Sequence, residues 1–309
     1  MDSTEKQKTK TLNGVQSNGQ DSKGKRIDVL KTYKIYIDGK FPRTESGRYY
    51  VLKNKDGDIL ANVCQSSRKD FRDAVVAARK AQHPWASRSA YNKGQILYRI
   101  AEMLEGRKAQ FISELSDQGL SMAAASSEVA QSIDRLVYYA GWSDKYQQVY
   151  SSVNPVESSH FNFSVPEPTG VVSILSPENY GLIGLVSTIA PAIVGGNTVV
   201  ALSSSAKPLC AVTFAEVLHS SDLPAGVVNI LTGHRSELLS HFSNHMDVNA
   251  CIYTGDNAAD IKKIQENASL NVKRPLIYSK DNWMDDSSQS PHRIMDLQEI
   301  KTTWHPIGQ

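Results

Sequence analysis

The spacing of hydrophobic residues changes along the chain. From Lys69 onward apolar residues recur every three to four positions, as at Phe71, Val75 and Ala78, and this period predicts helices. From Val171 onward short apolar runs alternate with helical segments. The helices expected in the first region run from Lys69 to near Pro84, where proline should stop the helix, and cover Tyr91–Gly106, Lys108–Gln118 and Ala123–Tyr139.

The stretch from Glu167 to Val200 predicts a strand, a crossover helix and a second strand. The apolar, β-branched run Val171–Leu175 suits a strand buried on both faces of a parallel sheet. Pro177 ends this run, and Asn179 is well placed to cap the following helix. Leu182–Val194 is apolar almost all round, so it predicts an interior helix. With Thr198–Leu202 as the second strand, this is a βαβ unit of an α/β, doubly wound (Rossmann-like) fold.

Shorter patterns surround this unit. Asp38-Gly39 is a hairpin signal at the end of an alternating run from Tyr33. His160–Glu167 alternates like a half-exposed strand, and Met295–Ile307 alternates again near the C-terminus. Further strands are expected at Tyr49–Leu52, Ile59–Gln65, Val227–Leu231, Ala250–Tyr253 and Leu276–Tyr278, and further helices at Leu209–Ser220, Glu237–Ser243 and Ala258–Glu266.

Composition divides the chain further. Residues 1–28 contain almost nothing apolar, so they are expected to form a disordered tail. Residues 29–280 form the predicted domain, and 281–291 are polar and Ser-rich, as expected for a linker.

Charge and cysteine content exclude several classes of protein. The net charge of +2 marks the chain neither for nucleic acid nor for an anionic membrane. The apolar run Leu182–Val194 is too short to span a bilayer, and an apolar signal region is not seen. Cys64, Cys210 and Cys251 are an odd number, each flanked by apolar or small residues, which predicts reduced, buried thiols. We therefore expect a soluble, cytoplasmic protein.

Several short motifs follow one another in a specific order. They are E-P-x-G-V-V from Glu167, P-x-N from Pro177, I-A-P-A with G-N-T-V-V, D-L-P-A-G-V-V-N-I-L-T-G from Asp222, and Y-T-G from Tyr253. In this order they resemble the cofactor domain of NAD(P)-dependent aldehyde dehydrogenases, over about residues 31–282. The resemblance implies that the strand near 158–167 projects and serves subunit contacts, and that 292–309 supply a C-terminal oligomerisation strand. It also implies a catalytic domain between the two segments, where this chain has only the linker. The chain is thus identified as a truncated member.

The resemblance assigns catalytic roles that this sequence fills poorly. The family's nucleophilic cysteine belongs to the missing domain, and neither Cys64, Cys210 nor Cys251 matches it. Asn179 matches the family's oxyanion asparagine, although an asparagine there is also expected simply to cap a helix or stabilise a turn. The general-base glutamate falls near Tyr278, and a phenol with a pKa near 10 is a poor base.

The cofactor positions implied by the resemblance are also altered. Pro177, Asn179 and Gly255 keep the family's cofactor-site residues. Leu202 and Ser205, however, replace the lysine and glutamate that hold the ribose in the family, and Asp256 and Asp260 replace the serine and glycine that face the pyrophosphate. A carboxylate there caps the helix and repels phosphate. NAD or NADP is the family's cofactor, and weak or absent binding is predicted.

His234, His241 and His245 are candidate metal ligands, because two of them are four residues apart. No third ligand or second shell is evident, so ordinary surface histidines and no metal are predicted.

Three hypotheses follow. The first is a non-catalytic subunit that associates with a full-length aldehyde dehydrogenase subunit or with itself. The second is an NAD(P)-dependent oxidoreductase that acts on the aldehyde group in its own right. The third is a binding module that uses the cleft for another small molecule. The absent nucleophile argues against the second, and the C-terminal strand favours the first over the third.

Overall fold

The computed structural model describes residues 29–308. The chain divides into two units, Met1–Leu30 and Lys31–Gln309, and every helix and strand described lies in the second. The tail predicted for residues 1–28 lies outside the described residues.

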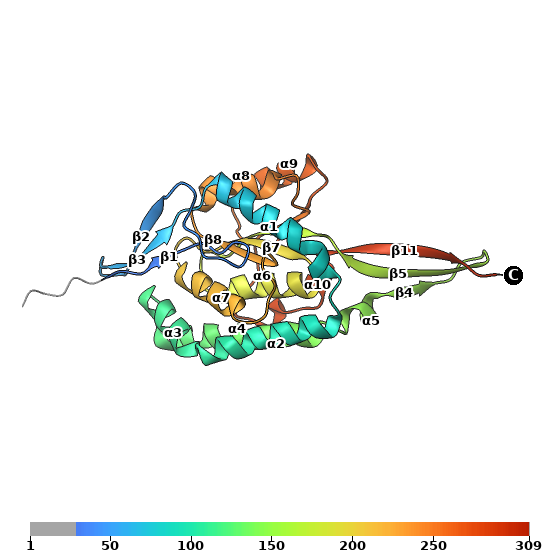
Figure 1. The fold of residues 1–309 in the computed structure, drawn as a ribbon, viewed down its shortest axis with the longest axis horizontal. Helices are drawn as coiled ribbons and strands as arrows, with labels where there is room; N and C mark the ends of the chain where they lie inside the picture. Colours follow the sequence, from blue (N-terminus) through green and yellow to red (C-terminus); the bar gives the residue numbers. More distant parts are fainter. Residues whose placement is uncertain (1–28, 309) are drawn as a thin grey trace, which may run out of the picture. The chain divides into compact units, whose positions relative to one another are not determined.

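A five-stranded parallel sheet forms the centre of the second unit (Figure 1). Its strands lie in the order β10, β9, β6, β7, β8. The predicted strand–helix–strand unit is confirmed, because α6 (Ile183–Val194) joins the fully buried strands β6 (Val171–Leu175) and β7 (Thr198–Leu202). Gly196, at φ 87°, turns the chain from α6 into β7 in a conformation that L side chains rarely adopt. The other strands are β8 (Val228–Leu231), β9 (Ala250–Tyr253) and β10 (Arg274–Ile277).

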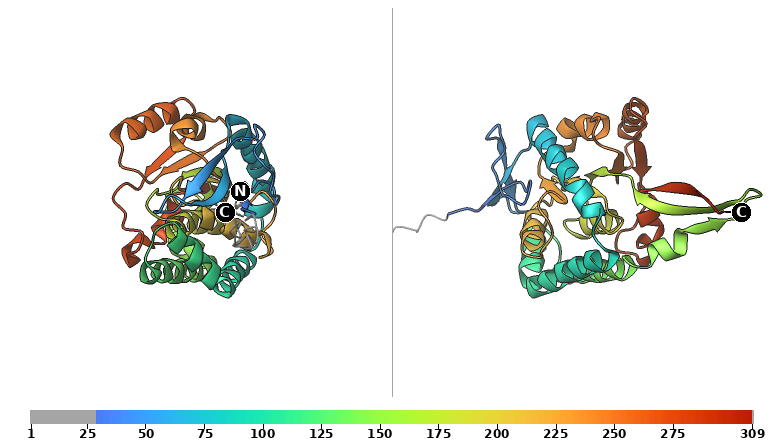
Figure 2. Two further views of the ribbon diagram at one scale, coloured as in Figure 1. Left: turned by 90° about the vertical axis from the view of Figure 1, so that its left-hand side faces the viewer. Right: turned by 45° about the vertical axis from the view of Figure 1, so that its right-hand side comes forward.

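Helices cover both faces of the sheet (Figures 1 and 2). Val172 and Ile174 of β6 pack in one core with α2, α3, α4, α6 and α7. Val171 and Leu175 point to the other face and pack with α1, α8 and α9. Alternate residues of a strand face opposite sides, and a strand that is apolar on both sides therefore needs two helical layers. The bounds are α1 (Arg68–Ala86), α2 (Ala90–Gly106), α3 (Lys108–Asp117), α4 (Met122–Trp142), α7 (Leu209–His219), α8 (Arg235–Asn244) and α9 (Ala258–Ser269).

The N-terminal strands form a second sheet in the order β1 (Thr32–Tyr33), β3 (Ile59–Cys64), β2 (Tyr49–Lys53). The predicted hairpin turn is confirmed, since Asp38 and Gly39 both have positive φ between paired flanking residues. The strand predicted from Tyr33 to Asp38 is wrong beyond its start. β1 ends at Tyr33 because Tyr36 leaves this sheet and forms a bridge to Ile230 of β8.

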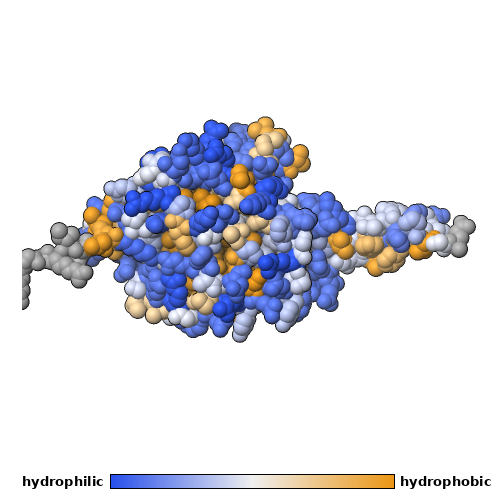
Figure 3. Space-filling view, viewed as in Figure 1, coloured by the Kyte–Doolittle hydropathy of each residue, from blue (hydrophilic) through white to orange (hydrophobic). Residues whose placement is uncertain are grey.

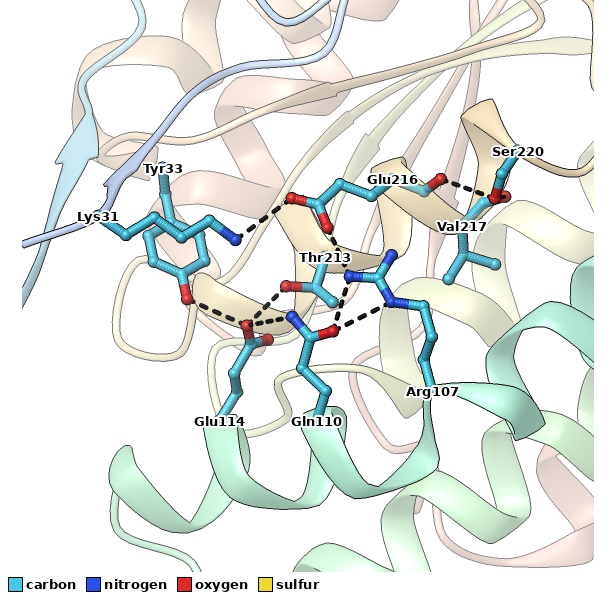
Figure 4. Close-up of polar contacts among 9 residues, drawn as sticks. All are labelled: Lys31, Tyr33, Arg107, Gln110, Glu114, Thr213, Glu216, Val217 and Ser220. Carbon is cyan, nitrogen blue, oxygen red and sulfur yellow. Dashed lines mark hydrogen bonds and ion pairs between the residues drawn. The ribbon is translucent and has the colours of Figure 1, made fainter.

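A polar network fastens this N-terminal segment to the helices (Figure 4). Glu114 of α3 accepts hydrogen bonds from the Tyr33 hydroxyl at 3.0 Å and from Thr213 Oγ1 at 2.7 Å. Glu216 of α7 pairs with Arg107 at 2.5 Å. Residues far apart in the sequence thereby connect β1, α3 and α7.

The third sheet contains β4 (Ser152–Asn154), β5 (His160–Pro168) and β11 (Gln298–Pro306), with β5 in the middle. β11 pairs antiparallel with β5 along its whole length. The two alternating segments predicted as strands, His160–Glu167 and Met295–Ile307, are thus neighbours in one sheet. These strands extend beyond the helical layers in Figures 1 and 2. Two short helices, α5 (Tyr146–Tyr150) and α10 (His292–Met295), precede β4 and β11.

Two further predictions concern the joins between elements. The helix expected to stop near Pro84 ends two residues beyond it, at Ala86. Pro84 has no N–H to bond the carbonyl four residues earlier, and the helix closes within the same turn. The segment 281–291 joins β10 to α10 and contains the 3₁₀ turn η1 (Asp286–Ser288). Trp283 in this segment is buried, and the buried Arg135 of α4 donates to the Trp283 and Asp285 carbonyls at 3.3 Å each.

Candidate functional site

The strand order places a candidate site at the carboxyl edge of the parallel sheet. After β6 the chain adds β7 and β8 on one side of that strand and then β9 and β10 on the other. Such a reversal of strand order leaves a crevice at the carboxyl ends of the strands, where doubly wound folds bind ligands. Here the loop after β6 carries Pro177 and Asn179, and the loop after β9 carries Gly255. The structure therefore brings the predicted site residues to one edge.

Asn179 does not cap the following helix. The N-cap of α6 is Leu182, so that expectation was wrong. The helix start is instead held by the buried Glu128 of α4, whose Oε1 accepts hydrogen bonds from the amides of Gly181 (3.0 Å), Leu182 (2.8 Å) and Ile183 (3.2 Å). A carboxylate at this position also complements the helix dipole.

The side chain of Asn179 is exposed, and its backbone carbonyl accepts a hydrogen bond from Lys207 Nζ at 2.6 Å. Pro177 is buried against Gly184, where a Cβ would meet the proline ring at 2.4 Å. Pro177 thus packs the loop onto α6, and Asn179 faces solvent.

Glu178, between these two residues, fills the edge of the crevice. Its Oε2 accepts hydrogen bonds from the Ser205 amide at 2.8 Å, from Ser205 Oγ at 3.0 Å and from Ser204 Oγ at 3.3 Å. Ser205 was predicted to stand where the family's ribose-binding glutamate lies. In this chain Ser205 binds the protein's own carboxylate. Leu202, at the predicted lysine position, is buried in the core on the α1 side of the sheet.

Arg235, the first residue of α8, lies beside Glu178 at this edge. Its guanidinium lies 3.6 Å from Glu178, donates to the Ser176 carbonyl and sits 5.1 Å from the centre of the Tyr253 ring. A Cβ built on Gly255 would meet Tyr253 Oη at 2.5 Å and Arg235 Nη1 at 2.8 Å. The space that a glycine leaves beside the loop after β9 is therefore taken by the chain's own side chains.

The start of α9 is also occupied. Its N-cap is Asn257, whose Oδ1 accepts from the amides of Ala259 (2.9 Å) and Asp260 (3.1 Å). The predicted cap by an aspartate was wrong, because Asp260 instead accepts a hydrogen bond from Tyr253 Oη at 3.0 Å. Burial, with this bond to a carboxylate, raises the pKa of Tyr253. The amides expected to face a pyrophosphate are thus capped by Asn257, and two carboxylates, Asp256 and Asp260, stand beside them.

The three cysteines are free and buried, as predicted. Burial raises the pKa of both Cys210 and Cys251, the former well above the ordinary thiol value. A buried thiol held in its neutral form is a poor nucleophile. Neither group supplies the thiolate that attack on an aldehyde requires.

Tyr278, predicted to stand in place of a general base, is held by contacts with two residues, Arg293 and Asp296. Its hydroxyl donates to Asp296 Oδ2 at 2.8 Å, and Arg293 lies 4.2 Å above its ring. Burial, followed by the Asp296 charge, raises its pKa, so the phenol stays protonated at neutral pH. Tyr278 therefore holds α10 and cannot accept a proton from water.

The three histidines do not meet. His234 packs against Tyr50 with ring centres 5.0 Å apart, whereas His241 and His245 lie at the other end of α8. Among residues 29–308, no group of three or more histidine, cysteine or acidic side chains is placed to hold a metal ion.

Sequence reasoning missed Glu128, Arg235 and Asn257. Asn257 was detectable, since an asparagine directly before an amphipathic run is a helix-start signal. Glu128 and Arg235 act on segments more than 50 residues away, and no local pattern marks them.

No helix in the described part of the chain combines the length and the hydropathy needed to cross a bilayer.

Comparison with known proteins gives a consistent result. The sequence model of the Aldehyde dehydrogenase family matches residues 41–278. The Aldehyde dehydrogenase of Aspergillus niger is 31% identical over 244 residues, which cover 78% of this chain and 48% of the relative. Omega-crystallin of Enteroctopus dofleini is 29% identical over 278 residues, or 85% of this chain and 55% of the relative. The structure of a Bacillus cereus aldehyde dehydrogenase in complex with NAD+ aligns with a TM-score of 0.76 at 25% identity, over 80% of this chain and 50% of the other. The chain spans about half the length of these relatives.

Proposed function

This chain belongs to the aldehyde dehydrogenase family, and we propose that it acts as a non-catalytic subunit associated with a complete aldehyde dehydrogenase. In this proposal the assembled complex is the oxidoreductase. The chain contributes its cofactor-domain fold and the strands of the third sheet. We also propose a cytoplasmic location, because free, buried thiols such as Cys210 and Cys251 suit a reducing compartment.

The observation that carries the proposal is the occupied crevice. Arg235 and Tyr253 fill the space beside Gly255, and Glu178 takes the Ser205 donors. A dinucleotide would have to displace an ion pair, a cation–π contact and several hydrogen bonds. The residues at this edge therefore do not fit the diphosphate and ribose of NAD or NADP. No hydride-transfer step is assigned to this chain.

The third sheet supports association with another subunit. Within the described residues, the outer edges of β4 and β11 have no strand partner. Phe161 and Trp304 are 45% and 57% exposed, on opposite faces of the sheet, and Figure 3 shows apolar residues along it. A small sheet with open edges and bare apolar groups gains stability by pairing with another chain.

The proposal is tested by isolating the tagged chain from its own cells and identifying what co-purifies. We expect a full-length aldehyde dehydrogenase in a fixed ratio. Truncation after Pro291 is unsuitable as a test, because it also removes Ile294 and Leu297, which are buried in the main core. Truncation after Glu299 keeps both residues and removes most of β11, so it should abolish co-purification. Assembly unchanged by that truncation would contradict the proposal. If the chain assembles only with copies of itself, the partner is a second copy of this chain and not a full-length aldehyde dehydrogenase.

The second candidate function is NAD(P)-dependent oxidation of an aldehyde by this chain itself. The likeness to a structure solved with NAD+ favours it. The same occupied crevice opposes it. Cofactor binding and turnover by the purified chain distinguish the two candidates.

A further inference from the structure

A groove of about 630 Å³ lies between the first turns of α1 and the C-terminal end of α8. Arg68, Lys69 and Arg72 line it from α1, and His241 and His245 line it from the α8 side. No carboxylate is among its lining residues, and none of them belongs to the crevice described above. The volume lies within the range of small-molecule pockets.

The three cations differ in how they are neutralised. Lys69 pairs with Glu45 at 2.6 Å, and Arg72 pairs with its neighbour Asp73 at 2.9 Å. Arg68, the first residue of α1, is exposed and takes no part in the ion pairs that Lys69 and Arg72 form in the described part of the chain. Arg68 and Arg72 are one helical turn apart, so their guanidinium groups project from the same side of α1.

Burial and the positive charge of Arg68 lower the pKa values of both histidines in the groove. Burial lowers the pKa of His241, and Arg68 and Lys263 lower it further. Burial also lowers the pKa of His245, against the opposing charge of Asp247, with Lys273 and Arg68 adding to the reduction. Phe71 lies 5.7 Å from the His245 ring and gives this end of the groove an apolar wall. Both imidazoles are therefore neutral hydrogen-bonding groups at pH 7 in a field that attracts anions.

We propose that this groove binds a small anion carrying two or more phosphate groups, with Arg68 as its main contact and Arg72 as the second. Guanidinium groups match phosphate oxygens in planar, bidentate hydrogen bonds, and the imidazoles supply neutral donors. The guanidinium group of Arg68 can bind two phosphate oxygens at once. Arg72 exchanges its ion pair with Asp73 for one with phosphate. A compact groove with its cations at one end suits a small molecule better than an extended acidic peptide. This site is independent of the proposed subunit role.

Inorganic pyrophosphate is the probe, titrated into the full-length chain by calorimetry at constant ionic strength. We expect saturable binding with one site, and we expect the pKa values of His241 and His245 to rise when it binds, as measured by NMR. Arg68→Glu should weaken binding at least about tenfold, since a charge-assisted hydrogen bond is lost and repulsion is added. Arg68→Ala should weaken it less.

Lys34→Glu is the matched control, because Lys34 is an exposed cation outside the groove. It should leave the affinity for pyrophosphate unchanged, with circular dichroism confirming that every variant is folded. No saturable binding at 1 mM pyrophosphate (roughly the limit of a weak specific site), or an equal loss in Lys34→Glu and Arg68→Glu, would overturn the site. Equal or tighter binding of hexaglutamate would also overturn it, in favour of an acidic peptide.

Discussion

The Arg235 guanidinium lies 3.6 Å from the Glu178 carboxylate, across the crevice where the strand order reverses. The two residues come from the loop after β6 and from the start of α8. Their side chains are only 16% and 32% exposed, so solvent screens the pair only in part. The pair joins the loop after β6 to the start of α8 at the carboxyl edge of the sheet.

The first prediction concerns the cofactor. NAD and NADP should bind the isolated chain weakly or not at all, because Arg235 and Tyr253 fill the crevice. Arg235→Ala alone should not restore tight binding, since Leu202 and Ser205 still replace the expected ribose contacts. Titration calorimetry checks both. A dissociation constant of about 10 μM or tighter, near −7 kcal/mol, for the unaltered chain would contradict the occupied crevice.

The second prediction concerns turnover. The purified chain should not reduce NAD or NADP with any aldehyde, because burial keeps the thiols of Cys210 and Cys251 neutral and Tyr278 cannot act as a base. Absorbance of the reduced nicotinamide measures this directly. Activity that survives removal of contaminating dehydrogenases and disappears in Cys251→Ala or Asn179→Ala would show that the chain is itself the enzyme.

The third prediction concerns assembly. Trp304→Ser should weaken co-purification with a partner at least about tenfold, because aromatic anchors dominate interface energies. Trp304 is 57% exposed on β11, so the substitution should leave the fold unchanged. Val76→Ser, at a 60% exposed apolar position on α1, is the matched control and should have no effect. Equal behaviour of the two variants in pull-down and light scattering would remove the third sheet from the interface.

The fourth prediction concerns stability. Glu128→Ala should lower the free energy of unfolding by about 3 kcal/mol, because three buried amide donors at the start of α6 lose their acceptor. Glu128→Gln keeps an acceptor oxygen and should cost about half as much. Glu266→Ala, at an exposed ion pair on α9, should cost under about 0.5 kcal/mol. Urea unfolding measures all three, and equal costs for Glu128→Ala and Glu266→Ala would contradict the capping role.

The fifth prediction concerns pH. Lys273 is buried and donates to the carbonyls of His245 and Val248 at 2.7 and 2.9 Å, and burial lowers its pKa from 10.5 to about 8. Below pH 8 both the folded and the unfolded chain carry this proton. Between pH 8 and 10.5 the unfolded chain still holds the proton that the folded chain has lost, so stability rises with pH.

The comparison for that prediction is Lys273→Met, which has no such proton. The stability of the unaltered chain relative to this variant should rise by about 3 kcal/mol between pH 7.5 and 11 (roughly the window set by the two pKa values). Denaturant unfolding at several pH values provides the curves. Parallel curves across that window would show that Lys273 titrates normally.

The sequence by itself determined the central layer. The run Val171–Leu175, apolar except for Ser173, is followed by an all-round apolar helix, and the two leave only an arrangement buried on both sides. The strand and the helix appear where the pattern places them. The Asp38-Gly39 turn was equally local, because few residues accept two successive positive φ angles. The order of the short motifs identified the family.

Only the tertiary structure decided what fills the crevice. Glu128 reaches the start of α6 from α4, and Arg235 reaches the loop after β6 from α8. Each contact depends on how separate elements pack together, whereas the spacing of residues within one helix records only which face is buried. The same limit explains Tyr36, which an alternating pattern assigned to one strand and which pairs with Ile230 in another sheet. Local periodicity fixes which side of an element faces the core, and the contacts between distant elements fix which charge meets which.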